Sequence, residues 1–405
     1  MKWRKSGRLV TVCVAAAVAV AILQGCATLK RHTAVPAALQ DRAEIPGLVN
    51  VRYRIGINDA ELVREGIECN KRELAYLAAL GPEGPMPPAI ALAVSGGGDN
   101  GAFGAGLLNG WTAVGNRPEF KLVTGISTGA LIAPFAFLGP QYDETLKEVY
   151  TNISGEDIAK PRNILAAIFS DAMADNAPLW RLLEKYITRE MLDAIASEYT
   201  TKGRLLLVGT TDLDAQQPVI WNMSKIAASK DPKALKLFRT IMIASAAIPG
   251  AFPPVMIDVY ADGRHYQEMH VDGGATTQVF IYPPSLHIEE VQAATHQRER
   301  RVYIIRNSRL DPAWSQVERR TMSIAGRAIS SLIQTQGIGD LDRIYLIAKR
   351  DGADFNLAFI PATFNPPHEE QFDTEYMRQL FALGYELAAE GYPWQKAPPG
   401  FVPGE

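Results

Sequence analysis

The chain has 405 residues, of which 47% are hydrophobic and 21% are charged, an ordinary globular composition that suffices for one large α/β domain or two smaller ones. Its formal net charge is −3, and without the first 25 residues it becomes −7 (37 Lys and Arg against 44 Asp and Glu). This balance gives no reason to expect nucleic-acid binding.

Residues 1–25 predict a lipoprotein signal peptide. Four basic residues precede the apolar run Leu9–Leu23, which is too short to span a membrane comfortably. The run ends in Leu-Gln-Gly-Cys with the cysteine at position 26, which resembles a bacterial lipobox. The alternatives are a signal peptide that happens to end at a cysteine and an uncleaved N-terminal anchor.

The lipobox resemblance implies that Cys26 is acylated and becomes the new N-terminus. Two or three acyl chains anchor a protein stably where one does not. Neither residue 27 nor residue 28 is Asp, which by the same resemblance favours the outer membrane of a bacterial envelope, on its periplasmic or surface face. Because Cys13 lies in the signal, only Cys69 remains, which excludes an intramolecular disulfide and a cysteine metal site.

Residues 26–88 predict a tether and an N-terminal helical extension. Alternating apolar residues in 45–58 favour a strand or an extended arm, and Asn58 and Asp59 look like the N-cap of a helix that runs to Leu80. The breaker-rich segment 81–88 then marks a boundary. We expect a catalytic domain over residues 89–390 and a C-terminal tail over 391–405.

The first unit of this domain predicts an anion site. Ala89–Val94 is apolar throughout, as in a strand buried on both faces, and leads through a glycine-rich loop into a helix over 102–111. Backbone N–H groups of such a loop, together with the helix dipole, favour an anion. A nucleotide phosphate is one conceivable ligand, but no phosphate-loop motif fits, so we favour the oxyanion of an acyl-transfer intermediate.

The second unit carries Gly125-Ile126-Ser127-Thr128-Gly129 between an apolar strand over 120–124 and a helix over 130–138. A strand, a tight turn and a helix are the context in which G-x-S-x-G forms a nucleophile elbow. Side chains in place of Gly125 and Gly129 would clash in so tight a turn, which lifts the Ser127 hydroxyl out of the sheet.

The rest of the chain predicts further helices and strands. Residues 152–178 are irregular and could form a lid or a lipid-facing segment. The predicted helices lie at 144–151, 179–187, 190–197, 235–246, 323–333 and 372–390, and the predicted strands at 205–211, 219–222, 255–260, 264–271, 301–307, 343–348 and 355–360. The strand at 264–271 stops at Asp272-Gly273-Gly274, where a carboxylate followed by two glycines is well placed to reach a serine hydroxyl.

Four blocks in one order resemble the patatin-like phospholipases: the glycine-rich loop, the G-x-S-x-G turn, the segment Ala244–Pro253 and the Asp-Gly-Gly turn. The resemblance covers about residues 89–278. It implies a three-layer α/β/α sandwich with a central, mostly parallel sheet.

The resemblance also implies a serine lipid acyl hydrolase of phospholipase A or lysophospholipase type, which acts on membrane lipids or lysophospholipids without a metal or cofactor. Ser127 would be the nucleophile and Asp272 the base of a Ser–Asp dyad. The implied oxyanion hole consists of Gly96, Gly97, Gly98 and Asp99, chiefly Gly97 and Gly98. The implied glycines of the nucleophile elbow are Gly125 and Gly129, and those of the Asp-Gly-Gly turn are Gly273 and Gly274. Asn100 stands where the family usually has Arg or Lys, and Gln278 where Asn is common, so a preference for anionic head groups stays open.

Several alternatives remain at this level. A Ser–His–Asp triad would nominate His368. The chain could also be a non-catalytic lipoprotein scaffold on a hydrolase fold, or an acyltransferase with the same acyl-enzyme. Asp99 could simply cap the next helix, and Asp212 and Asp214 are more typical of turn residues than of metal ligands. His270 lies two residues before Asp272 and could play an auxiliary part.

The lipobox predicts the outcome of a cysteine substitution. Cys26→Ala should release the protein from the membrane fraction of the producing cell or block its processing, because no acyl chain can then be attached. Fractionation followed by immunoblotting measures this. Unchanged membrane association would rule out the lipid anchor.

Overall fold

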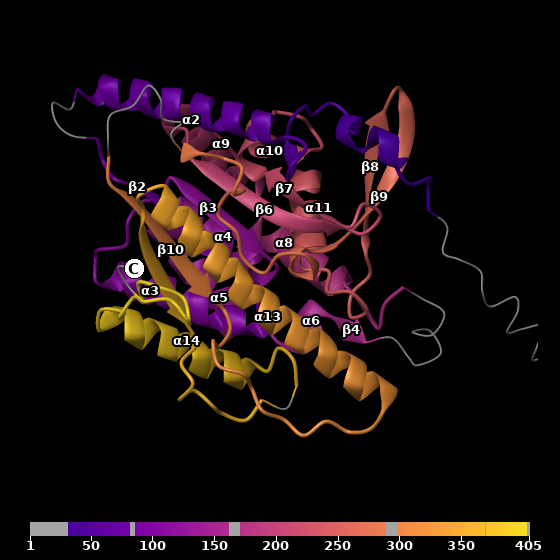
Figure 1. The fold of residues 1–405 in the computed structure, drawn as a ribbon, viewed down its shortest axis with the longest axis vertical. Coiled ribbons are helices and arrows are strands. Elements are labelled where there is room, and N and C mark those ends of the chain that lie inside the picture. Colours follow the sequence, from indigo (N-terminus) through magenta and orange to yellow (C-terminus); the bar gives the residue numbers. More distant parts are fainter. Residues whose placement is uncertain (1–30, 82–85, 162–170, 289–297, 369, 403–405) are drawn as a thin grey trace, which may run out of the picture.

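The computed structural model describes most of the chain and leaves the predicted signal peptide and Cys26 outside the described residues (Figure 1). Within the described residues, no helix is both long and apolar enough to cross a bilayer. The described ranges are 31–81, 86–161, 171–288, 298–368 and 370–402.

A nine-stranded sheet forms the centre of the protein, in the order β1-β7-β6-β3-β2-β10-β11, with the hairpin β8–β9 joined to β6. The five neighbouring strands from β6 to β11 are parallel, which confirms the predicted mostly parallel sheet. The strands are β1 (Arg52–Arg54), β2 (Ala89–Val94), β3 (Leu122–Ile126), β6 (Leu205–Asp212), β7 (Gln217–Asn222), β8 (Val255–Ala261), β9 (Arg264–Asp272), β10 (Arg300–Arg306) and β11 (Asp354–Phe359).

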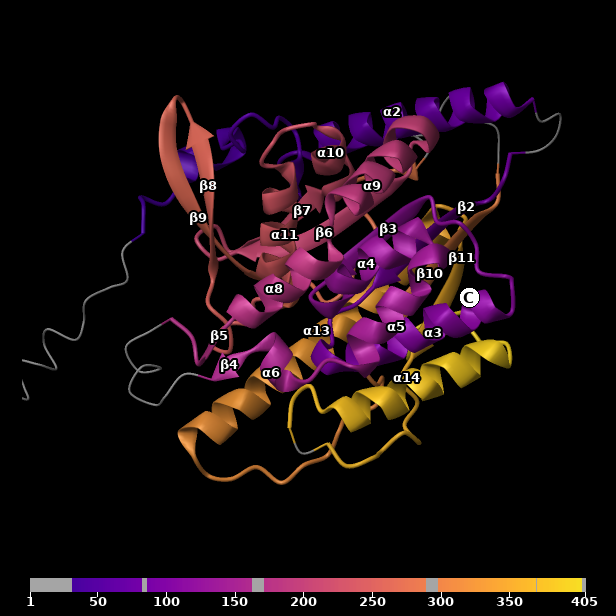
Figure 2. The same cartoon turned by 180° about the vertical axis from the view of Figure 1, so that it is seen from behind.

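Helices cover both faces of this sheet and make three layers. In Figure 1 α13 crosses in front of the strands, and in Figure 2 the opposite face shows α4, α5 and α9 in front. The described helices are α2 (Asp59–Leu80), α3 (Gly101–Ala113), α4 (Thr128–Leu138), α5 (Asp143–Thr151), α6 (Gly155–Ile158), α8 (Ala177–Tyr186), α9 (Arg189–Lys202), α10 (Met223–Ala228), α11 (Ala234–Ser245), α13 (Thr321–Arg350) and α14 (Thr374–Ala389). The predicted α/β/α sandwich is confirmed.

Two of the apolar clusters among the described residues separate the helices from the sheet on its two faces. The larger one joins α3, α4 and α11 to one face of the sheet, and the smaller one joins the last turns of α13 to the other face. Strands β2 and β10 contribute to both cores, because their alternate side chains point to opposite faces.

The predicted strand over 343–348 is wrong. These residues belong to α13, which runs without a break to Arg350. Leu341, Ile344, Tyr345 and Ala348 are buried at helical spacing, whereas Leu346 is exposed. A short apolar run fits both periods, and here the adjoining helix extends through it.

The segment before α2 packs against the body of the protein. Residue Arg31 pairs with Asp214, and Glu44 pairs with Tyr260 of the β8–β9 hairpin through backbone hydrogen bonds. Strand β1 then joins the sheet next to β7. Part of the predicted tether region is therefore attached to the sheet, while the predicted domain boundaries remain predictions.

Helices α3 and α14 approach each other unusually closely. A Cβ atom on Gly106 would lie 2.0 Å from the Phe381 carbonyl oxygen, and one on Gly384 would lie 2.3 Å from the Phe103 carbonyl oxygen. Glycine on both helices therefore sets the separation of the two backbones. Because α3 begins directly after the glycine-rich loop, this contact also fixes the helix behind that loop.

We predict that Gly106→Ala lowers the free energy of unfolding by about 1–3 kcal/mol, because the added methyl group forces the two helices apart. Urea unfolding followed by circular dichroism measures the change. Gly339→Ala is the matched control, since no atom lies within 4 Å of its added Cβ. It should be neutral or stabilising by up to about 1 kcal/mol. Equal effects of the two variants would contradict the close packing.

Candidate active site

Ser127 lies in a strained turn between β3 and α4. Its φ of 54° and ψ of −124° are unusual for a residue with a side chain, as in a nucleophile elbow. A Cβ on Gly125 would lie 2.4 Å from the Gly129 carbonyl oxygen, and one on Gly129 would lie 2.2 Å from the Val94 carbonyl oxygen. The turn thus needs glycine on both sides of the serine.

Strand β6 brings Asp272 to this turn. Its Gly209 pairs with Ile126 at the end of β3, and its next residue, Thr210, pairs with Asp272 at the end of β9. The two strands therefore meet along one edge of β6, so that the residue after Ile126 and the last residue of β9 become neighbours. Both Ser127 and Asp272 are buried, with 6% and 5% of their surfaces exposed.

The Asp272 carboxylate has an unusual electrostatic environment. Burial raises its pKa to about 6, although the nearby Ser127 hydroxyl and the Gly274 N–H group oppose this shift. Its Oδ1 accepts a hydrogen bond of 2.7 Å from Gly274 N, while Oδ2 has no partner among the described residues. The serine is thus close enough to influence the pKa without a completed hydrogen bond, and catalytic hydrogen bonds often tighten only when substrate is bound.

The glycine-rich loop offers two backbone donors. Gly96 N–H donates to the Gln278 carbonyl oxygen over 3.1 Å and is engaged there. The N–H groups of Gly97 and Gly98 have no acceptor within the part of the chain that the structure describes. Gly98 has a φ of 60°, which favours glycine. Within the described loop, these two N–H groups therefore remain available to donate hydrogen bonds to a bound anion.

Asn307, which follows β10, holds this loop from the side. Its backbone N–H donates to Ser95 Oγ over 2.9 Å, its Nδ2 donates to the Ser95 carbonyl oxygen over 3.0 Å, and its Oδ1 accepts from Gly104 N. A Cβ on Gly97 would lie 2.3 Å from the Asn307 carbonyl oxygen. Sequence reasoning missed Asn307 because it lies in no motif and more than 200 residues from the loop.

The side chains of the loop are tied to the segment before α14. Asp99 accepts hydrogen bonds from His368 Nε2 over 2.7 Å and from Phe372 N over 2.8 Å. Asn100 Oδ1 accepts one from the Tyr376 hydroxyl over 2.6 Å. Asp99 is therefore not a helix cap.

His368 does not take the part expected of a triad histidine. It pairs with Asp99 and stacks on the Tyr376 ring with 4.0 Å between the ring centroids. Among the described residues, neither Ser127 nor Asp272 is a hydrogen-bond partner of His368. The geometry thus gives the Ser–His–Asp alternative no support.

Ser245 at the end of α11 joins Ser127 to β6. Its Oγ accepts a 3.0 Å hydrogen bond from Ser127 N and donates one of 2.7 Å to the Gly209 carbonyl oxygen. The sequence placed Ser245 within the Ala244–Pro253 block but gave its hydroxyl no role. The available signal was that Ser245 has the one polar side chain in this otherwise apolar block, next to a proline turn.

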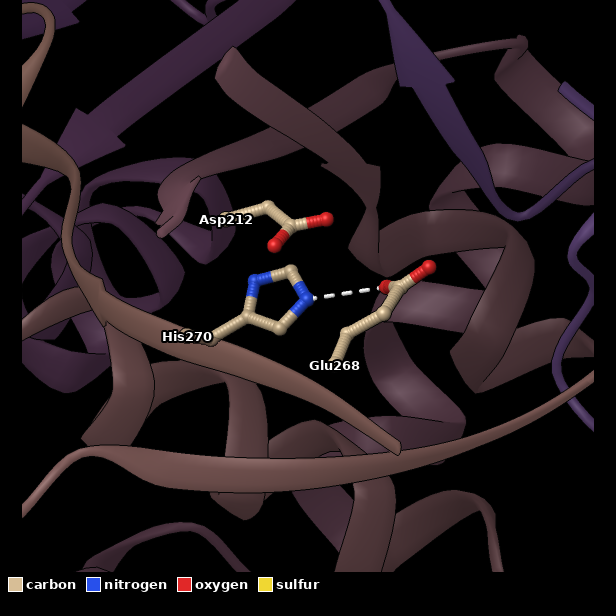
Figure 3. A group of neighbouring side chains, drawn as sticks. All are labelled: Asp212, Glu268 and His270. Carbon is tan, nitrogen blue, oxygen red and sulfur yellow. Dashed lines mark hydrogen bonds and ion pairs between the residues drawn. The ribbon is translucent and has the colours of Figure 1, made fainter. Parts of the chain in front are cut away.

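A charged cluster lies on β9 just before Asp272 and includes His270. The ligand atoms of Asp212, Glu268 and His270 lie within 4.8 Å of one another, a grouping that could hold a cation (Figure 3). Arg52 forms an ion pair with Glu268, and Arg54 forms ion pairs of 2.8 Å with both carboxylates. Two guanidinium groups thus balance two carboxylates, and a cation would have to displace them. We interpret the cluster as an ion-pair network.

This network fixes the orientation of His270. Because a carboxylate only accepts hydrogen bonds, His270 Nε2 donates to Glu268 over 3.1 Å. Its Nδ1 lies 2.9 Å from Thr210 Oγ1, which also accepts from Trp221 Nε1. Burial opposes ionisation of Glu268, but Arg52 and His270 hold the pKa of Glu268 below its usual range. The network therefore clamps β9 to β1, β6 and β7 just before Asp272.

An apolar cavity of about 60 Å³ lies beside the candidate site. Gly98 of the loop and Thr128 of the elbow are at its border. Its other lining residues come from α4, α5, α6, α8 and the segments around α5 and α14: Leu131, Phe135, Val149, Tyr150, Ile153, Ile158, Leu179, Leu182, Leu183, Tyr186, Ile187, Phe372 and Met377. Ile153 and Ile158 of the predicted lid segment 152–178 thus border this cavity, and residues 162–170 lie outside the described residues.

We predict that Ser245→Ala lowers the free energy of unfolding by about 1–3 kcal/mol, because it leaves the Ser127 N–H and the Gly209 carbonyl oxygen buried without partners. Chemical denaturation measures the loss. Ser330→Ala removes an exposed hydroxyl that bonds to Gly326 O and serves as the control, with a change within about 0.5 kcal/mol. If Ser245→Ala were as stable as this control, the assigned hydrogen bonds would be wrong.

No curated protein sequence matches the chain. Among solved structures it is similar to VipD from Legionella pneumophila, with 12% identity over 76% of this chain and 66% of that chain and a TM-score of 0.37. It is also similar to human GIVD cytosolic phospholipase A2, with 9% identity over 80% of this chain and 56% of that chain and a TM-score of 0.31.

A third similar structure is the type III effector ExoU, with 13% identity over 76% of this chain and 53% of that chain and a TM-score of 0.27. The chain spans between about half and two thirds of the length of these three structures. The family model described as patatin-like phospholipase matches residues 92–283, a range that contains both Ser127 and Asp272. Residues 92–283 therefore match a patatin-like phospholipase domain, which supports a lipid acyl hydrolase.

Proposed function

We propose that this protein is a serine lipid acyl hydrolase of phospholipase A or lysophospholipase type, with Ser127 as nucleophile and Asp272 as base. One observation carries the proposal: β6 pairs with the ends of both β3 and β9 and so places the serine beside a buried carboxylate. The pKa of about 6 leaves Asp272 mostly ionised at neutral pH yet close enough to that pH to exchange a proton.

The proposed reaction has two steps. Asp272 takes the proton of the Ser127 hydroxyl as Oγ attacks the carbonyl carbon of the ester. The carbonyl oxygen becomes an oxyanion that accepts hydrogen bonds from the N–H groups of Gly97 and Gly98. The intermediate then collapses, Asp272 returns the proton to the leaving alcohol, and an acyl-enzyme remains. Water then attacks the acyl-enzyme, with Asp272 again as the base. The same two steps release the fatty acid and regenerate the Ser127 hydroxyl.

The apolar cavity supports a lipid substrate. It borders the loop and the elbow, and its lining is almost wholly aliphatic and aromatic. An acyl chain bound there would have its carbonyl group near the Gly97 and Gly98 donors. Since a carboxylate base has no tautomer to fix, the dyad needs no third residue to orient it.

We further propose that the enzyme works at a bacterial envelope membrane, held there by an acylated Cys26. The support is the lipobox-like sequence before this cysteine. Nothing in the charge balance favours a nucleic-acid partner. An anchored enzyme would meet its lipid substrates at the surface of the same membrane.

Covalent labelling with a fluorophosphonate, located by peptide mass spectrometry, tests the dyad. The labelling rate should rise with pH through about 6 and then level off, because the charged form of Asp272 is the base. Ser127→Ala should abolish the adduct, and Asp272→Asn should slow labelling on the order of 10³-fold or more.

Ser330→Ala serves as a matched control, because it removes a hydroxyl far along the chain from the dyad and should label at the parent rate. Near-full labelling of Asp272→Asn would remove Asp272 from the mechanism. Absence of an adduct in a folded parent protein would favour the scaffold alternative.

A further inference from the structure

Helix α13 is much longer than the strands it connects. It has 30 residues and spans about 45 Å, whereas β10 has seven residues and spans about 23 Å. The chain leaves β10 at its carboxyl end and returns through α13 to the start of the parallel strand β11. The helix must therefore extend past one edge of the sheet, as Figure 1 shows.

The contacts of α13 locate this overhang. Gln334 donates to the carbonyl oxygens of Arg309 and Leu310, and Gly337 lies against the Arg306 guanidinium at the end of β10. The turns after Gly337 are packed on the sheet, whereas residues 328–333 are all exposed. The N-terminal half of α13 thus projects beyond the carboxyl edge of the parallel strands, which is the edge that carries Ser127.

The overhang exposes large apolar side chains in the described structure. Their exposed fractions are Trp314 87%, Val317 38%, Ile324 54%, Ile329 56%, Leu332 69% and Ile333 41%. On the helix, Ile329, Leu332 and Ile333 lie on one side by their i, i+3 and i+4 spacing, whereas Ile324 lies on another. Ile333 and Ile329 stand one and two turns before Gly337, so they extend past the sheet the stripe that faces it at Gly337 and Leu341. We call residues 314–333 the overhang surface.

Its charge is opposite to that of the whole chain. Arg319, Arg320 and Arg327 lie in or beside the first turns of α13, and residues 319–339 contain no Asp or Glu, although the full chain has a net charge of −3. Arg320 pairs with Glu318, and Arg327 donates to the Ala313 carbonyl oxygen. The overhang surface therefore combines apolar side chains with a local excess of positive charge.

We propose that the overhang surface docks the catalytic edge onto an anionic lipid surface. An exposed apolar helix face bordered by arginines, with a tryptophan at its end, is typical of elements that lie in a membrane interface. The proposal rests on the proposed function for its purpose, since a lipid hydrolase must take its substrate from such a surface. The docking itself depends only on the chemistry of the overhang surface.

Charge favours a lipid surface over a second copy of the chain. In a two-fold dimer this surface would face itself and bring six arginines (three from each copy) together with only two carboxylates (Glu318 from each copy), an excess of four positive charges. Anionic head groups would instead neutralise the arginines while the apolar side chains enter the interface.

Vesicle flotation tests this docking. The protein is the mature chain, residues 26–405, with Cys26→Ser to remove the acyl anchor and Ser127→Ala to keep the lipid intact. It should float with phosphatidylcholine vesicles that contain phosphatidylglycerol, less with phosphatidylcholine alone, and less at high salt. Adding Leu332→Asp should weaken the partition coefficient about tenfold or more, because a charge then faces the acyl region.

Leu346→Asp provides the matched control. Leu346 is 58% exposed on the same helix but lies in the turns beyond Gly337, away from the overhang, so binding should be unchanged. Arg319→Gln combined with Arg320→Gln should reduce the preference for phosphatidylglycerol vesicles. Parent-like flotation of the Leu332→Asp protein would overturn the proposal.

Two further measurements identify the other occupants of this surface. A dimer mass in light scattering that becomes monomeric only in Leu332→Asp would make the overhang surface an interface between copies. A lower melting temperature in Leu332→Asp, but not in Leu346→Asp, would show that another segment of the chain covers it. Either result overturns lipid docking.

Activity separates this proposal from the proposed function. With Ser127 intact, Leu332→Asp should keep the parent kcat/KM on a short-chain soluble ester and lose activity on vesicles about tenfold, in line with its binding. An inactive parent that still floats would reject the hydrolase and keep the docking. A parent that cleaves the soluble ester but does not float would reject the docking and keep the hydrolase.

Discussion

The pairing of β6 with two strands on the same side is the constraint on which the candidate site depends. Gly209 ends the parallel register with β3, and Thr210 begins the antiparallel register with β9. A slip of one residue in either register would turn Asp272 to the other face of the sheet. Ser245 reinforces the junction, because its hydroxyl bonds both to β6 and to the backbone of Ser127.

The same junction carries an electrostatic cost that other parts of the fold offset. Asp272 is buried and its Oδ1 accepts one hydrogen bond, from Gly274 N, and burial raises its pKa to about 6. Ionisation of this carboxyl group therefore lowers the stability of the fold as the pH rises from about 4, its usual pKa, to about 6, and the loss is constant above that pH. Upstream on β9, Glu268 and His270 are held by Arg52, Arg54 and Thr210. A strand fixed this firmly can end in a poorly solvated carboxylate without losing its register.

The sequence predicted local features well because short-range physics determines them. The elbow glycines and the strand Ala89–Val94 follow from sterics and burial within a few residues. Residues that act across the fold left no such pattern. Asn307, for example, supports the glycine-rich loop but follows β10, about 200 residues later in the chain. The error at 343–348 has a different cause, since that apolar run suits both a strand and a helix, and only the packing of α13 decides.

Asn100 stands where patatin-like phospholipases usually have Arg or Lys, and its contacts give this difference a structural role. Asn100 accepts a hydrogen bond from Tyr376, and the neighbouring Asp99 binds His368 and Phe372 N, so the side chains of the glycine-rich loop hold it to the start of α14. The backbone N–H groups of Gly97 and Gly98 have no acceptor among the described residues, which agrees with their proposed role as oxyanion donors. A cation at position 100 would lose the acceptor that Tyr376 uses. The side chains of Asp99 and Asn100 therefore hold the loop in position, and the arginines proposed to meet anionic lipid lie instead on the overhang surface of α13.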